Sequence, residues 1–128
     1  MAIIKNNIIE VKNSTSNYIL LDVRSPAEFE HAHIPGAYSL PLFDNEQRAI
    51  VGTTYKKQSR EEAIKIALPF FGDKMKQMVE TVETLCSDYE KVHQIKPMVF
   101  VHCWRGGMRS AAVAWLLDLY GFKVIQLN

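Results

Sequence analysis

Residues 97–110 of the chain read PMVFVHCWRGGMRS, and the order of residue types in this stretch decides the expected fold. Met98–His102 is a short apolar run rich in Val and Phe, which predicts a buried strand. After the pair of glycines the pattern becomes that of a helix, MRSAAVAWLLDLY. Cys103 therefore stands where a strand ends and a helix is about to begin, with Gly106 and Gly107 in the connecting loop.

This context gives Cys103 the surroundings of a nucleophile. Glycines allow backbone N–H groups to turn inward, and inward N–H groups beside a helix N-terminus form a cradle for anions. Arg105 and Arg109 add positive charge. A thiol at the lip of such a cradle should ionise more easily than a free thiol. The stretch predicts a nucleophilic thiolate facing an anion pocket; the alternative is a buried structural cysteine.

Composition sets the outer limits of the interpretation. The chain has 128 residues, 48% of them hydrophobic and 23% charged, which suits one domain over residues 1–128. The net charge of +1 gives no argument for or against nucleic acid. No apolar run approaches the roughly 20 residues that cross a bilayer, and the N-terminus is too polar for a signal peptide. Two cysteines in unlike contexts argue against a disulfide scaffold and favour the cytoplasm.

Strands and helices alternate along the chain. Ser25 and Ser59 each begin a capping box and so predict helix starts. This alternation predicts an α/β protein with a parallel sheet flanked by helices. The expected strands cover residues 3–11, 18–23, 37–40, 98–102 and 123–127, and the expected helices cover a short segment from 26, then 46–51, 59–71, 73–89 and 108–120.

Three segments together resemble a rhodanese domain. LLDVRSPAEFEHAHIPGAYSLP resembles the N-terminal signature of that family, the Cys103 loop its active-site loop, and GFKVIQL its closing strand. The resemblance covers nearly the whole chain. It implies a rhodanese-like, doubly wound parallel sheet flanked by helices on both faces, and a cysteine that carries sulfane sulfur as a persulfide. It also implies that Asp22 and Arg24 lie near the mouth of the active site in a supporting role.

A narrower resemblance is carried by CWRGGMRS and by PLFDNEQRAIVGTTYKKQS, which look like the rhodanese half of the tRNA 2-selenouridine synthase family. It implies replacement of the sulfur of 2-thiouridine at the tRNA wobble position by selenium, and a geranylated thio-intermediate. We expect selenophosphate or a sulfane sulfur donor as substrate and no cofactor bound by this domain. The other half of that family is a P-loop domain, and no G-x-x-x-x-G-K-[ST] occurs here. We therefore expect an excised domain or one subunit of a split enzyme, with tRNA and a P-loop domain as partners and no membrane.

The loop length leaves two alternatives open. Arg109 lies six residues after Cys103, where many rhodaneses have five, and this is the spacing of Cys-x5-Arg phosphatases of rhodanese fold. A phosphatase would also need a general acid, and Asp44 is the nearby candidate. A non-catalytic module that docks tRNA or the P-loop partner is the third interpretation. The loop residues WRGGMR and the segment after residue 41 favour the selenouridine family.

The expected site has one reacting residue and two groups around it. His102 is interpreted as a core histidine that steadies the loop, and Trp104 either stacks on a base or prenyl chain or covers the loop. The expected residues are Cys103 as nucleophile; Trp104, Arg105, Gly106, Gly107, Met108 and Arg109 for anion and substrate binding; and Asp22, Arg24 and His102 in support.

Other chemistry-bearing residues receive structural interpretations. Cys86 lies on the apolar face of a helix and is expected in the core, as is Trp115 with Ala111, Ala112 and Leu119. His31 and His33 could suggest a metal pair, but a structural role is preferred. A small basic cluster near Tyr55 could contact tRNA, but a solvated face is preferred. The cluster consists of Lys56, Lys57 and Arg60.

Overall fold

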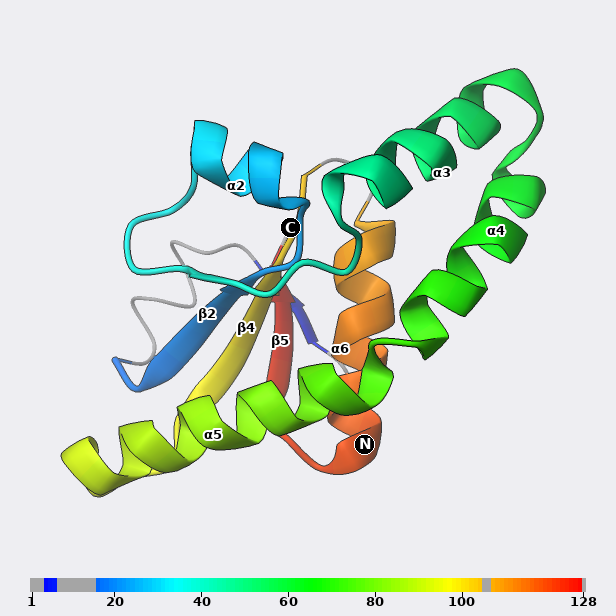
Figure 1. Cartoon of the computed structure of the whole chain (residues 1–128). Coiled ribbons are helices and arrows are strands. Elements are labelled where there is room, and N and C mark those ends of the chain that lie inside the picture. The colour runs from blue at the N-terminus through cyan, green and yellow to red at the C-terminus, as the bar shows by residue number, and fades with distance from the viewer. Residues whose placement is uncertain (1–3, 7–15, 105–106, 128) are drawn as a thin grey trace.

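The computed structural model describes residues 4–6, 16–104 and 107–127, and its strands form one parallel sheet (Figure 1). The strand order is β1-β5-β4-β2-β3, and every neighbouring pair is parallel. The strand before Cys103, β4, is therefore the central one. The strands are β1 Ile4–Asn6, β2 Tyr18–Asp22, β3 Tyr38–Ser39, β4 Met98–His102 and β5 Val124–Leu127.

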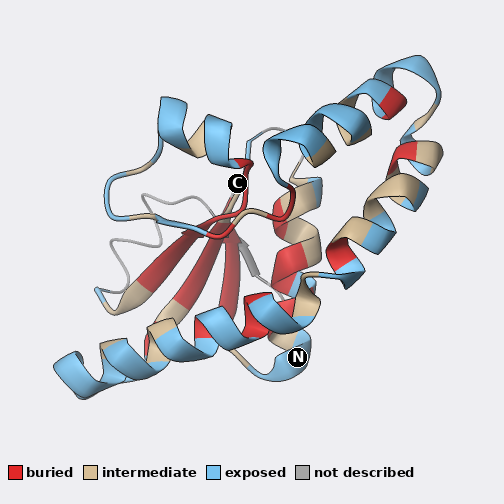
Figure 2. Ribbon diagram, in the orientation of Figure 1, coloured by how far each residue is buried: buried red, intermediate tan, exposed pale blue. Residues whose placement is uncertain are grey.

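Apolar residues on both faces explain why the middle of the sheet is buried. Leu21 and Val101 belong to the larger core cluster on one face, whereas Leu20 and Phe100 belong to a smaller cluster on the other. Successive side chains of a strand point to opposite faces, so a strand buried on both sides is apolar throughout. Figure 2 shows these central strands as buried along most of their length.

Helices α5 and α6 cover the face that carries the larger cluster, through Met78 and Val82 of α5 and Val113 and Leu117 of α6. Helices α3 and α4 form a hairpin that extends away from the sheet (Figure 1). Its surface is mostly exposed (Figure 2). The helices are α2 Pro26–His31, α3 Asn45–Lys57, α4 Arg60–Gly72, α5 Met75–His93 and α6 Met108–Tyr120.

The expected α/β architecture is confirmed, with differences in detail. Helix α3 begins one residue before the expected 46–51, after a capping box formed by Asp44 and Gln47, and continues six residues beyond the expected end, to Lys57. Helix α5 continues four residues beyond the expected end, to His93. Of the expected strand over 3–11, residues 4–6 form β1, and residues 7–15 lie outside the described part of the chain.

The prediction that Trp115 lies in the core was wrong. Trp115 is 50% exposed and Leu119 is 61% exposed. Helix α6 is apolar nearly all the way round, so the 3.6-residue period fits more than one face. The face that packs on the sheet carries Ser110, Val113, Ala114 and Leu117, and Trp115 points away from it.

Candidate active site

Cys103 directly follows the last residue of the central strand, and α6 begins five residues later, at Met108. The strand ends of β2 and β4 meet here, where Asp22 is paired in register with His102. The Cys103 side chain is buried, but its sulfur faces polar groups: the Ser110 N–H donates to Sγ at 3.3 Å, and the thiol donates to Ser110 Oγ at 3.2 Å. Because Ser110 is the third residue of α6, its N–H has no partner within the helix and is available to the sulfur.

A buried network around Ser110 holds this loop. Ser110 Oγ donates to the Gly107 carbonyl at 3.1 Å, and Gln126 Nε2 donates to Ser110 Oγ at 2.9 Å and to the Gly107 carbonyl at 3.0 Å. Gly107 has φ of +72°, a left-handed conformation that side chains disfavour. A Cβ there would also lie 3.1 Å from Gln126 Nε2. The glycine expected to shape the loop is therefore required both by its backbone and by its neighbour.

Asp22 and Arg24 form a buried ion pair at the end of β2. Arg24 Nη2 donates to Asp22 Oδ2 at 2.7 Å and to the Ala32 carbonyl at 2.6 Å, and both side chains are buried. The hydrogen bond to Asp22 raises the pKa of Arg24 against the opposing effect of burial. The guanidinium also lies 5.7 Å from the ring centre of Trp104, which is 55% exposed. The pair thus places a fixed cation beneath the aromatic ring that follows Cys103.

Two other titratable groups are neutral at neutral pH. Burial lowers the pKa of His102, and the charges of Arg24 and Arg109 lower it further while Asp22 opposes them. Burial, with a contribution from Glu90, raises the pKa of the Cys86 thiol to about 11. Cys86 packs against the main core cluster, as expected. A neutral thiol in that position is not poised to attack a persulfide.

Arg109 does not present a free guanidinium to the loop. Its Nη1 donates to Glu28 Oε1 at 2.7 Å and its Nη2 donates to Glu28 Oε2 at 3.2 Å. Arg48 of α3 donates to the same carboxylate at 2.8 Å. The expected roles of Arg105 and Gly106 fall on positions outside the described residues. Whether Arg109 contacts an anion stays a prediction.

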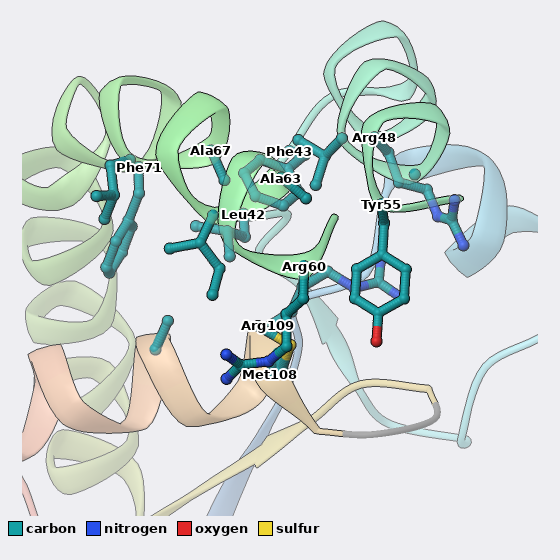
Figure 3. A pocket seen from close by; sticks show the side chains of 15 residues that line it. Leu42, Phe43, Arg48, Tyr55, Arg60, Ala63, Ala67, Phe71, Met108 and Arg109 are labelled. Atoms are coloured by element: carbon teal, nitrogen blue, oxygen red, sulfur yellow. The ribbon is translucent and has the colours of Figure 1, made fainter. Parts of the chain in front are cut away.

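An apolar cavity of about 320 Å³ lies between α3, α4 and the start of α6 (Figure 3). Its walls include Phe43, Ala67 and Phe71, and Met108 and Arg109 bring the Cys103 loop to its edge. Arg48, Tyr55 and Arg60 are the other polar residues named in Figure 3. A concave apolar site with a few polar groups at its edge is typical of small-molecule binding.

Several residues that the sequence raised as candidates lie away from this cavity. Asp44 caps α3 by accepting from the Gln47 N–H at 2.7 Å, and it lines a second hollow of about 210 Å³ beside Lys74 rather than the cavity at Arg109. His33 stacks on Phe29 with ring centres 3.7 Å apart. Among the described residues, no three His, Cys, Asp or Glu side chains are grouped to hold a metal. None of the described helices is both long and apolar enough to cross a membrane.

Sequence reasoning missed three residues of this site. Ser110 and Gln126 are buried polar residues, and the signal that could have found Gln126 was a polar side chain inside the apolar strand VIQL. Glu28 was interpreted only as the third residue of a capping box. Its pairing with Arg109 joins positions 81 residues apart, which no local pattern reveals.

The fold and the loop define a class: a parallel α/β protein with a cysteine at the carboxyl end of its central strand, held against the start of the following helix. The Rhodanese-like domain profile matches residues 6–128. The chain belongs to the rhodanese-like domain family.

Its curated relatives include tRNA 2-selenouridine synthases. The enzyme of Nitrosomonas europaea is 38% identical over 119 residues, which are 89% of this chain and 29% of that protein. The enzyme of Bdellovibrio bacteriovorus is 38% identical over 103 residues, 80% of this chain and 26% of that protein. The chain therefore spans less than a third of the length of these relatives, and it matches their rhodanese part.

Solved structures agree with this assignment. The N-terminal domain of a proposed ATP/GTP-binding protein from Clostridium difficile 630 is similar with a TM-score of 0.80 and 32% identity, over 99% of this chain and 91% of that one. A rhodanese-related protein from Thermoplasma volcanium has a TM-score of 0.51 at 16% identity, over 99% and 84% of the two chains. The second likeness concerns the fold alone.

Proposed function

We propose that this domain transfers sulfur or selenium through a persulfide or perselenide on Cys103. The observation that carries the proposal is the position of the sulfur at the carboxyl end of β4, where the Ser110 N–H donates to it at 3.3 Å. An amide that donates at this position can stabilise the negative charge of a terminal chalcogen bound to the sulfur. The family membership and the relatives named tRNA 2-selenouridine synthase support the same chemistry.

The first step is a balanced sulfur transfer. The Cys103 thiol loses its proton to solvent, and the thiolate attacks the outer sulfur of a donor such as thiosulfate. A new S–S bond forms while the donor S–S bond breaks, and sulfite leaves with the electron pair of that bond. A nucleophilic acceptor then removes the outer sulfur and restores the thiolate. A donor whose selenium is bound to sulfur, such as selenosulfate, would give the perselenide in the same way, with cleavage of its Se–S bond and departure of sulfite.

The test is mass spectrometry of the protein after treatment with thiosulfate. We expect the mass of one added sulfur on the peptide that contains Cys103, its loss in Cys103→Ser, and its retention in the matched control Cys86→Ser. Sulfur on Cys86, or an unmodified Cys103 in wild-type protein, would contradict the proposal. The docking alternative predicts instead that Cys103→Ser leaves both complex formation and the level of modified tRNA unchanged.

At the finer level, we propose that the domain acts within a tRNA 2-selenouridine synthase, with a P-loop domain or subunit handling phosphate. The relatives' name supports the tRNA substrate, and the Clostridium structure is named for an ATP/GTP-binding protein. The direct test is wobble 2-selenouridine in tRNA from cells that lack this chain. Restoration by the wild-type gene and not by Cys103→Ser supports the proposal, and restoration by both variants contradicts it.

The apolar cavity supports the further proposal that this domain binds the geranyl group of a thio-intermediate. It begins at Met108 and Arg109, the first residues of α6 after the Cys103 loop. Ala67→Phe would fill part of the cavity without adding charge. We expect this variant to weaken binding of a geranylated thiouridine while leaving sulfur loading of Cys103 in place. Equal binding by wild type and variant would exclude the cavity as that site.

A further inference from the structure

Arg109 is engaged on both of its terminal nitrogens. Its guanidinium forks onto the Glu28 carboxylate at 2.7 and 3.2 Å, and the two side chains are only 16% and 22% exposed. Two-point Arg–carboxylate pairs are strong and directional, and partial burial reduces screening by solvent. The arginine at the phosphatase spacing is therefore already bound to an anion, which belongs to the protein.

Glu28 is itself held in place. Its Oε1 accepts from the Ser25 N–H at 3.2 Å, from the Ser25 hydroxyl at 2.9 Å and from Arg48 Nε at 2.8 Å, in addition to Arg109. Burial on its own would raise the pKa of Glu28. The hydrogen bond and the charge of Arg109, together with the hydrogen bonds from Ser25, instead lower this pKa to about 2. The carboxylate is thus charged at any working pH, and it cannot move aside without losing several partners.

We propose that Glu28 determines anion specificity at the Cys103 site by occupying the guanidinium of Arg109, so that phosphate held by a two-point arginine clamp is disfavoured there, whereas a donor that reaches Cys103 through its outer chalcogen atom does not need that clamp. An arriving phosphate must either displace Glu28 from Arg109 or bind beside a carboxylate of the same sign. A persulfide concentrates its charge on one terminal atom and does not need the two-point clamp. This inference rests on the proposed function, in which a partner handles phosphate and Cys103 carries only the sulfur or selenium atom.

The test is calorimetric titration of inorganic phosphate into wild type, Glu28→Gln and the control Glu30→Gln. Glu30 lies on the same helix and is exposed, so its substitution makes the same charge change away from Arg109. We expect Glu28→Gln to bind phosphate roughly tenfold more tightly than the other two proteins, because the Arg109 fork becomes free and the like charge beside it is removed. The gain should disappear in Glu28→Gln combined with Arg109→Met. Unchanged or weaker phosphate binding by folded Glu28→Gln would overturn the proposal.

A second comparison keeps the proposal testable if Glu28→Gln does not fold. With Glu28 in place, Arg109→Lys, which keeps the charge but removes the two-point fork, should change phosphate affinity by less than about twofold, since that fork is not available to the ligand. A loss of about tenfold or more in this variant would show that Arg109 clamps phosphate despite Glu28, and would refute the proposal. Sulfur loading of Cys103 in wild-type protein is scored separately. Failed loading with the expected phosphate results would count against the transferase and not against the role of Glu28.

Discussion

Replacing Ser110 with alanine should loosen the Cys103 loop by a measurable and limited amount. The hydroxyl is fully buried and takes part in three contacts, to Cys103 Sγ, the Gly107 carbonyl and Gln126 Nε2. In the variant, Gln126 Nε2 still donates to the Gly107 carbonyl, so neither the Gln126 amide nor the Gly107 carbonyl is left without a partner. A net hydrogen bond is worth about 1 kcal/mol, and we expect the free energy of unfolding to fall by about 2 kcal/mol.

Urea denaturation followed by circular dichroism measures this change. With a slope of about 2 kcal/mol per molar urea, the midpoint should fall by about 1 M with the slope unchanged. The matched control is Ser87→Ala, at an exposed position of α5, which should change stability by less than about 0.5 kcal/mol. A midpoint for Ser110→Ala within error of that control would refute the assignment of the network.

The same variant tests the link from the network to the chemistry. Ser110→Ala keeps the backbone N–H that donates to the sulfur but removes the hydroxyl, which can rotate to donate to an anionic sulfur. We expect persulfide formation on Cys103 to slow by roughly three- to tenfold, the effect of one hydrogen bond. An unchanged rate in a folded variant would show that the hydroxyl is structural only.

Three further predictions follow from the same contacts. Gly107→Ala should lower the free energy of unfolding by about 1 to 3 kcal/mol in urea denaturation, because the alanine Cβ is strained at positive φ and displaces Gln126. Cys86→Ser should keep wild-type sulfur loading in the mass-spectrometric assay, since the Cys86 thiol has its pKa raised to about 11. The pKa of Glu28 falls from 4.5 to about 2 on folding, so the charged carboxylate stabilises the fold fully above about pH 4.5, and this stabilisation is lost as the pH falls toward 2. The side chain is partly exposed, which reduces the effect. In acid denaturation over that range, the free energy of unfolding of wild type should therefore fall by about 1 to 2 kcal/mol relative to that of Glu28→Gln.

Local sequence signals predicted much of the fold. The start of α4 was predicted correctly because Ser59 accepts from the Glu62 N–H at 3.0 Å, a contact that depends on neighbouring residues only. Strand β4 followed from an unbroken apolar run. The order of strands in the sheet could not be derived in this way, because side-chain alternation shows which faces are buried and not which strands are neighbours. Helix α6 shows the limit within one element, since its apolar residues allowed two faces and Trp115 was placed on the wrong one.

For the site, the sequence predicted the reacting residue and the elements on either side of it. The hydrogen-bond partners of those residues were harder to predict, because they come from distant segments of the chain. Gln126 reaches Ser110 from the last strand, and Glu28 reaches Arg109 from the first helix after β2. Such pairs become visible only when the sheet brings the strand ends together. The Cys-x5-Arg spacing suggested a phosphate clamp, whereas the structure pairs that arginine with an internal carboxylate.

The central place of β4 has a consequence for how the reactive loop moves. The strand is paired along both edges, to β2 and to β5, so its amides are released only when the middle of the sheet opens. Amides of residues 99–101 should therefore exchange with deuterium at the rate of global unfolding, in contrast to those of the α3–α4 hairpin. The anchor of Cys103 thus belongs to the last part of the molecule to open, and brief openings elsewhere would leave the sulfur where it is.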